Sequence, residues 1–464
     1  MASQAPRYGD WLDAAQVDSL GHALGDPASL REIRSDSFRS FLELPLEPDP
    51  LYRKYGYFAG VDLTGLSAET SGGPVFHGAA PPATVLVIHD SAGSHAQVPP
   101  ELSELGVHVL TYPEVLQREG VGVSAFLRGT DKPTDRLTAL GVALLNRGYR
   151  LDLPDGLTQP VRLKDITILS REHEALSVRR SVRLGRATRL LASEEVYSAG
   201  AVPAAQRLYG SSTDLDVGPA AHVAYLTAHA PDTRAVSIYT RHATVGDGGR
   251  LGWVWAGFGG FRTRMRNTTL LPGNGSDVED LQAFYGAQHQ GYDSSVNITH
   301  IGTDTHGQSI TRGVFRDEAR GMSRGLVRIE KDARRTLSYL SEHAMLLSRG
   351  ARSDTIPILE ILCRDVKATH STSVAPVDPE KIFYLESRGV SEGDAVQMIG
   401  EGFLAHVLER APFANLREIL YPYLHTRWEG RTVEWSGGAA TSLPALEFRG
   451  GEATTDWRFD AKLR

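Results

Sequence analysis

A series of short segments with alternating polarity runs through residues 221–371 and constrains the fold more than any other feature of the sequence. The segments are rich in Thr, Val and Ile and are often separated by turns that contain Gly, Asp or Asn, which is typical of β-strands. Few helical patterns interrupt them, so a doubly wound α/β sheet is disfavoured. The remaining folds are a sandwich, a barrel and a parallel β-solenoid. Because no strict repeat motif is present, the pattern alone does not choose among them.

Helical patterns flank this β-rich region on both sides. On the N-terminal side, Asp26 is predicted to be the N-cap of a helix that has Pro27 at its first position. On the C-terminal side, Ser391 is predicted to cap an amphipathic helix that ends before Pro412. Between residues 72 and 82, Gly, Pro and Ala crowd together without periodicity, as in a connector. We therefore expect an N-terminal helical region and linker (residues 1–82), a mixed α/β lead-in (83–148), a β-rich core (149–378) and a C-terminal helical domain (379–464).

The composition argues against several kinds of partner. A net charge of −7 at pH 7 does not attract a phosphate backbone, so nucleic acid is not expected to bind. No stretch approaches the ~18 uninterrupted apolar residues that cross a bilayer, and the first residues lack the pattern of a targeting peptide. A single cysteine, Cys363, rules out an intramolecular disulfide. We expect a cytoplasmic protein with no membrane partner.

Residues 344–409 carry an ordered set of short motifs, namely Leu-Leu-Ser (346–348), Asp-Thr-x-Pro (354–357), Leu-Glu-Ile (359–361), Asp-Val (365–366), Phe-Tyr-Leu (383–385), Ser-Arg-Gly (387–389) and Gly-Phe (402–403). This order of motifs resembles the C-terminal core signature of the SufB/SufD family of iron-sulfur cluster assembly proteins. Upstream, Leu-Pro-Asp-Gly (153–156) and Ser-Ser-Val (294–296) also resemble the family's core. The resemblance covers residues 149–410, and the N-terminal third of the chain is only loosely similar.

The resemblance implies a fold and a set of partners. It implies a right-handed parallel β-helix flanked by helical N- and C-terminal domains. In the family, SufB and SufD form a heterodimer whose shared interface is thought to shelter the nascent cluster, and the C-terminal helical domain docks the ATPase SufC. The expected partners are therefore a SufC-like ATPase and either a SufB-like subunit or a second copy of this chain. A reduced flavin has been linked to the family complex, and no GxGxxG turn places one here.

A single cysteine restricts the role within the family. A self-sufficient iron-sulfur scaffold holds its cluster with about four thiolates, and this chain has only Cys363. Any cluster or iron would therefore be shared with a partner subunit, which favours a SufD-like over a SufB-like role. A SufB-like member would also be expected to carry a cysteine near Glu342, and none is there. No GxxxxGKS/T P-loop occurs, so the chain is expected to be a non-catalytic subunit whose partner binds ATP.

His370 matches the family's functional histidine and is the leading candidate for a cluster or iron ligand. Its competing interpretation is a hydrogen-bonded strand histidine with no ligand. Cys363, Glu360 and Asp365 are weaker candidates. Cys363 continues the apolar face of its strand and is expected to be a small core residue, whereas the two carboxylates fit solvated strand positions.

The same resemblance implies that four residues of the C-terminal helical segment are candidates for docking SufC. They are Phe383, Tyr384, Arg388 and Phe403. Packing within the protein's own core is the alternative use of the aromatic side chains.

Two segments place arginines at the spacing of one strand face. They are residues 179–189 and the alternating set Arg262, Arg264 and Arg266. Such arginines could bind an anion, but alternating arginines on a strand usually form a solvated face. A solvated face is the expectation here.

Two other functions stay open. The first is a stand-alone β-helix carbohydrate-active enzyme with carboxylates in a surface groove, for which Asp304 and His306 are candidates. The second is a docking platform for the ATPase without a cluster function. Ala368 and Ser371 keep the second one open, because many family members have Cys and Gly at these positions.

Overall fold

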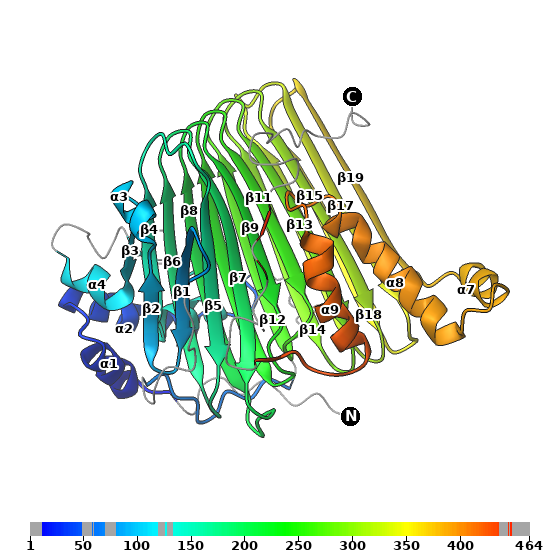
Figure 1. Ribbon diagram of the computed structural model, residues 1–464, viewed down its shortest axis with the longest axis horizontal. Helices are drawn as coiled ribbons and strands as arrows, with labels where there is room; N and C mark the ends of the chain where they lie inside the picture. Colours follow the sequence, from blue (N-terminus) through cyan, green and yellow to red (C-terminus); the bar gives the residue numbers. More distant parts are fainter. Residues whose placement is uncertain are drawn as a thin grey trace.

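The computed structural model describes residues 12–48, 58, 60–69, 80–118, 126–127, 133–435, 444 and 446–447. Within them, two long and mostly parallel sheets face each other and form a β-helix with helices at both ends (Figure 1). From β4 to β19 the chain alternates between the two sheets, so that odd-numbered strands lie in one and even-numbered strands in the other. The β-helix expected from the resemblance is thereby confirmed, and the sandwich and the barrel are excluded.

The first sheet has eleven strands and pairs in the order β19-β17-β15-β13-β11-β9-β7-β5-β1-β2, with β20 beside β7. Strand β1 lies in the expected α/β lead-in, yet it pairs in parallel with β5 of the core. Only β2 is antiparallel to its neighbour among these described strands. The strands are β1 (Thr84–Asp90), β2 (Gly93–Gln97), β5 (Val161–Leu169), β7 (Arg189–Ala199), β9 (His222–His229), β11 (Arg250–Gly257), β13 (Asp277–Gly286), β15 (His306–Phe315), β17 (Thr336–Leu346), β19 (Val366–Pro376) and β20 (Glu434–Trp435).

The second sheet has nine strands and pairs in the order β18-β16-β14-β12-β10-β8-β6-β4-β3. Strand β3 is antiparallel to β4, and the remaining pairs are parallel. The strands are β3 (His108–Thr111), β4 (Arg147–Leu153), β6 (Ala175–Leu184), β8 (Arg207–Val217), β10 (Ala235–Val245), β12 (Arg262–Leu271), β14 (Gly291–His300), β16 (Arg320–Ile329) and β18 (Arg352–Ile361).

Aromatic side chains fill the interior of the middle turns. Tyr225 packs edge-to-face on Trp253 with ring centroids 5.0 Å apart, and Tyr239 packs in the same way on Trp255 at 4.5 Å. Pairs of this kind contribute about 0.5–1.5 kcal/mol beyond the area that they bury. Aromatic packing therefore fills the middle turns within the first sheet, through Tyr225 and Trp253, and between the two sheets, through Tyr239 and Trp255.

A buried network of ion pairs also crosses the interior. Arg180 contacts both Asp165 and Glu194, and Arg241 contacts Glu194 at 3.2 Å. Burial alone would raise the pKa of Glu194, but the two guanidinium groups lower it to about 2. Removal of one partner would leave a buried charge unpaired, which costs about 3–5 kcal/mol. The network therefore links the two sheets through ion pairs that depend on one another.

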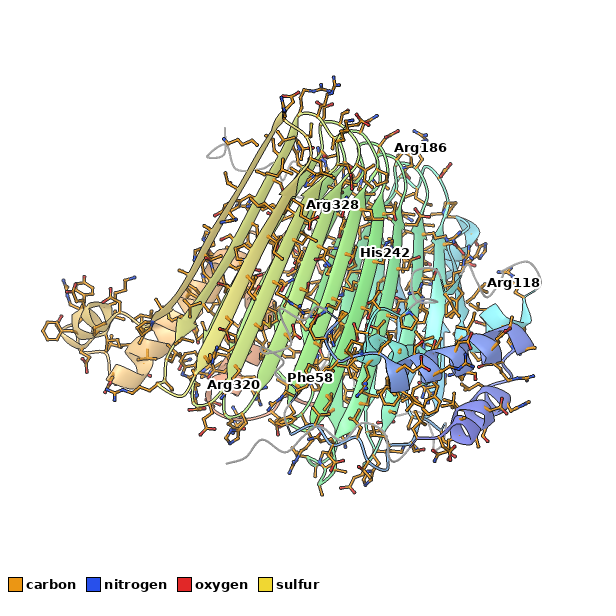
Figure 2. The ribbon with its side chains drawn as sticks, turned by 180° about the vertical axis from the view of Figure 1, so that it is seen from behind. Phe58, Arg118, Arg186, His242, Arg320 and Arg328 are labelled. Carbon is orange, nitrogen blue, oxygen red and sulfur yellow. The ribbon has the colours of Figure 1, made fainter. Side chains whose placement is uncertain are left out.

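The N-terminal helices pack on the outer face of the second sheet, which Figure 2 shows. Phe38, Phe41 and Leu140 from these helices belong to one buried cluster with Val236 and Ile238 of β10. The helices before the core are α1 (Ala14–Ala23), α2 (Ala28–Glu43), α3 (Pro100–Glu104), α4 (Tyr112–Gln117) and α6 (Arg136–Ala143).

The N-cap predicted at Asp26 is wrong. Helix α2 begins at Ala28, and its N-cap is Pro27. Asp26 is instead buried, where its carboxylate accepts hydrogen bonds from Arg34 Nε at 3.1 Å and from Tyr112 Oη at 2.6 Å. A buried guanidinium left without a carboxylate costs more free energy than an exposed helix start left without a side-chain cap. Asp26 therefore fixes α2 to the segment that contains α4.

Helices α8 and α9 cover the outer face of the first sheet, and α7 projects beyond its edge (Figure 1). Leu404 and Val407 of α8 belong to one buried cluster with Leu281 and Ile310 of the sheet. Ser391 is the N-cap of α8, as predicted. No helix in the described part of the chain has both the length and the apolar character needed to span a membrane. The C-terminal helices are α7 (Pro379–Glu386), α8 (Glu392–Leu408) and α9 (Leu416–Trp428).

Candidate functional site

The C-terminal end of the solenoid is open. Strand β18 pairs only with β16 and strand β19 only with β17, and no other described strand pairs with their outer edges. Most side chains of β18 are half-buried and most of those of β19 are exposed. Exposed apolar side chains lie here as well, namely Ile361, Leu362 and Val374. An uncovered edge of this kind is a template for pairing with another strand.

His370 stands on the interior face of β19 at this open end. It is in register with Leu340 of β17, which is buried in an interior cluster. Residues aligned across a parallel pair share one face of the sheet. His370 itself is exposed, because the described chain has no further turn that covers it. Its imidazole is therefore accessible to a group that approaches the open end.

Glu342 lies on the same face, one strand further in. It is in register with Thr372 of β19, and its Oε1 accepts a hydrogen bond from Ser323 Oγ of the opposite sheet at 2.7 Å. Its Oε2 is buried and has no hydrogen-bond partner of normal geometry among the described residues. Burial raises the pKa of Glu342 to about 7, against smaller opposing effects from the hydrogen bonds of Ser323 and the Ile356 amide. The interior face thus holds a carboxyl group that titrates near neutral pH.

The sequence interpretation does not select Glu342 as a site residue. A signal was nevertheless available, because Glu342 occupies an inward position between Leu340 and Ala344 in an alternating strand. A charged residue in the apolar phase of such a strand is either paired or functional.

Cys363 lies between β18 and β19 and is buried. It packs in an interior cluster with Val327, Ile329 and Leu340. Leu340 of this cluster is also in register with His370, so Cys363 and His370 lie at the same end of the interior. A free cysteine in apolar surroundings packs as a small hydrophobic residue.

The two weaker carboxylate candidates take different positions. Glu360 is on β18, where its carboxylate accepts a hydrogen bond from Arg328 at 3.0 Å. Asp365 is exposed between β18 and β19, and its main-chain oxygen accepts a hydrogen bond from the Arg335 amide at 2.7 Å. Across the described ranges, no group of three or more His, Cys, Asp or Glu side chains is placed to hold a metal ion.

Asp304 and His306, the candidates for a carbohydrate-active enzyme, are engaged in ion pairs. Asp304 receives two hydrogen bonds of 2.6 Å from Arg335, and His306 lies 3.9 Å from Asp277. Hydrogen bonds from Arg335 and then Thr303 lower the pKa of Asp304 to about 2. A glycosidase acid needs the opposite shift, so this pair does not have the properties of the enzyme's acid.

A family profile described as the SufBD core domain of the SUF system for FeS cluster assembly matches residues 168–403. The chain belongs to the SufB/SufD family. The matched residues run from the end of β5 into α8, so they include the open end and all the candidate ligand and docking residues. Among the relatives is the iron-sulfur cluster assembly protein SufD of Bacillus subtilis, which is 26% identical over 344 residues, or 73% of this chain and 77% of that protein.

Other SufBD family proteins match over shorter lengths. An iron-sulfur cluster assembly SufBD family protein of Mycobacterium leprae is 27% identical over 212 residues, or 46% of this chain and 24% of that protein. One from Staphylococcus saprophyticus is 26% identical over 205 residues, or 44% of each chain. The chain thus spans about a quarter of the mycobacterial relative, whereas its match to SufD covers most of both proteins. Within the SufB/SufD family, the chain is SufD-like.

The docking candidates of this SufD-like chain divide into two groups. On α7, Phe383 is 71% exposed and Tyr384 is 57% exposed, and the Arg388 guanidinium lies 5.2 Å from the centre of the Tyr384 ring. Helix α7 buries none of its residues. Phe403 of α8 instead packs against the buried cluster beneath that helix, with the Arg312 guanidinium 5.0 Å from its ring. Phe383 and Tyr384 therefore form an exposed aromatic surface, whereas Phe403 contributes to packing.

Proposed function

We propose that the chain is a non-catalytic, SufD-like subunit of a SUF-type iron-sulfur cluster assembly complex and that its open end pairs with a SufB-like subunit. The observation that carries this proposal is the uncovered last turn, where the edges of β18 and β19 lie beside His370. Strand edges bind other strands through main-chain hydrogen bonds, and the exposed apolar side chains add area. Membership of the SufB/SufD family supports iron-sulfur cluster assembly as the cellular process.

The cargo at this interface is a nascent cluster or iron that the two subunits share. His370 is the ligand that this chain would contribute, and thiolates of the partner would supply the rest. Ligation of iron by thiolates releases protons. Glu342, with a pKa of about 7 on the same interior face, is a group that can accept one of them.

The ATPase of the complex would dock on α7. Phe383 and Tyr384 project from a helix that buries none of its residues, and the stacked Arg388 adds a charge beside them. Aromatic and arginine side chains are the residues that most often dominate protein interfaces. The binding of ATP is left to the SufC-like partner.

To test the proposal, the tagged chain is purified anaerobically from its own cells. Its partners are then identified, and iron and sulfide are assayed. We expect a SufC-like ATPase, a cysteine-bearing SufB-like subunit and iron to be recovered together. His370→Ala should lose iron but keep both partners, whereas His289→Ala, which removes an exposed histidine in a turn, should behave like the wild type. Recovery of the chain alone and without metal would contradict the assembly role. Recovery of the partners with iron unchanged in His370→Ala would favour the docking platform.

A further inference from the structure

The alternating arginines of β12 do not form the solvated face expected from the sequence. Arg264 is only 2% exposed, and its Nη1 donates a hydrogen bond to the main-chain oxygen of Leu46 at 2.6 Å. Arg266 is mostly buried as well. Along the sheet, Arg266 is in register with Ser295 of β14, and Ser295 is in register with Arg324 of β16. Three guanidinium groups therefore gather on the outer face of the second sheet.

Two carboxylates from different parts of the chain meet these arginines. Asp293 of β14 accepts hydrogen bonds from Arg266 at 2.9 and 3.0 Å. Glu47 accepts hydrogen bonds from Arg324 at 2.9 Å and from Arg266 at 3.3 Å. Burial alone would raise the pKa of Asp293, but Arg266 and the neighbouring arginines hold it well below its usual range. Glu47 differs from Asp293 because it does not belong to the sheet, but to the segment that follows α2.

A groove of about 590 Å³ opens beside the arginine cluster. Its floor is the outer face of the second sheet, seen in Figure 2, and one wall contains Glu47 and Asp135, the N-cap of α6. Besides the arginines, the floor presents hydroxyl and amide groups from Thr268, Ser295 and Asn297. The volume falls within the range of about 300–1,000 Å³ that small-molecule sites occupy. The polar lining favours a ligand rich in hydrogen-bonding groups.

Arg264, which also lines the groove, has the least complete set of partners in the arginine cluster. Its Nε and Nη2 form no hydrogen bond with the described residues, and Nη2 lies 3.3 Å from Asp135 and 3.7 Å from Glu47. Burial, and then the neighbouring Arg266 guanidinium, lower the pKa of Arg264. A buried guanidinium with unused donors is costly until an anion accepts their hydrogen bonds.

We propose that this groove binds a small molecule through an oxyanion group, a phosphate or a carboxylate, and that Glu47 occupies the oxyanion position when the ligand is absent. The planar fork of a guanidinium matches both kinds of oxyanion. The hydroxyl and amide groups of the floor bind the polar remainder of the molecule. Because Glu47 is carried by the segment after α2, the ligand and this segment compete for the same arginines.

Isothermal titration calorimetry of the full chain with inorganic phosphate, adenosine 5′-monophosphate and succinate tests the proposal and separates the two oxyanions. Glu47→Gln removes the internal competitor, so it should tighten binding of the preferred probe about tenfold, and Arg324→Met should weaken it about tenfold. Arg320→Met is the matched control. Arg320 lies on the same strand and face as Arg324 but does not line the groove, so this variant should bind like the wild type.

The higher affinity expected for Glu47→Gln distinguishes loss of the competitor from misfolding, since a misfolded protein does not bind the probe more tightly. Tighter binding in Glu47→Gln together with weaker binding in Arg324→Met supports the site. Absence of saturable binding in both the wild type and Glu47→Gln would overturn the proposal. So would an equal loss in Arg320→Met and Arg324→Met, because it would indicate a general effect of surface charge.

Discussion

Ser323 of β16 donates a hydrogen bond to Glu342 of β17 across the interior at 2.7 Å, just beneath the open end of the solenoid. Burial raises the pKa of Glu342 from 4.5 to about 7, so the folded state holds this proton more tightly than the unfolded state. The stabilisation from this proton is complete below the pKa of Glu342 in the unfolded state. It is lost as the pH rises through the pKa of Glu342 in the folded state. Between these two values, the free energy of unfolding should fall with rising pH by up to about 3 kcal/mol.

Glu342→Gln should abolish this dependence, because glutamine keeps the shape and carries no proton to lose. Urea unfolding of the variant and the wild type at several pH values from about 5 to 8 measures the effect. The stability of the variant relative to the wild type should increase across this range. Glu360→Gln, which changes an exposed partner of Arg328, is the control and should show no such trend. A constant difference between Glu342→Gln and the wild type would show that Glu342 does not titrate in this range.

The buried pair of Asp26 and Arg34 makes a second prediction. Asp26→Ala leaves the Arg34 guanidinium buried without its carboxylate, which should destabilise the N-terminal helices by about 3–5 kcal/mol. Asp36→Ala removes the exposed partner of Arg39 on the same helix and should cost less than about 1 kcal/mol. Hydrogen exchange of the α2 amides measures both. Similar exchange rates in the two variants would mean that Asp26 does not anchor α2.

The secondary structure could be predicted from the sequence because its signals are local. The alternating segments recognised within residues 221–371 correspond to β9–β12, β14–β16, β18 and β19, and Ser391 caps α8 as predicted. Strands β13 and β17 were not recognised in the pattern. The choice of a solenoid over a sandwich came only from the family resemblance. Strands of both folds alternate in the same way, and what distinguishes them is the pairing of each strand with the next but one.

The predictions that failed depended on contacts between distant parts of the chain. Asp26 has the sequence context of an N-cap, but its partner Tyr112 is 86 residues away. Arg264 has the alternation of a solvated strand, but Leu46, 218 residues earlier, covers it. The inward position of Glu342 could have been read from the alternation of its strand, but its hydrogen bond with Ser323 of the opposite sheet could not. Local periodicity contains no information on such contacts, so the partner of a buried polar side chain could not be read from it.

The exposed aromatic pair of α7 makes a third prediction, on docking of the ATPase. The double variant Phe383→Ala with Tyr384→Ala should weaken binding of the SufC-like partner at least about tenfold, as loss of an interface hot spot does. Its melting temperature should not change, because α7 buries none of its residues. Met398→Ala, at a position of α8 that is also exposed, is the control. Pull-down with the purified ATPase measures the effect, and full binding by the double variant would place the docking surface elsewhere.

The exposed edge of β19 makes the last prediction, on pairing with the sister subunit. Val374 is 39% exposed on this edge strand, and Val202, in the segment between β7 and β8, is 47% exposed away from the open end. Val374→Glu places a charge where a partner strand would lie and should weaken the heterodimer at least about tenfold, because a charge on an edge strand opposes pairing. Val202→Glu adds the same charge at a similar exposure and should leave the heterodimer intact. Sedimentation velocity of each variant mixed with the SufB-like subunit distinguishes the two. If both variants form the heterodimer as well as the wild type, the open end is not the surface that binds the sister subunit.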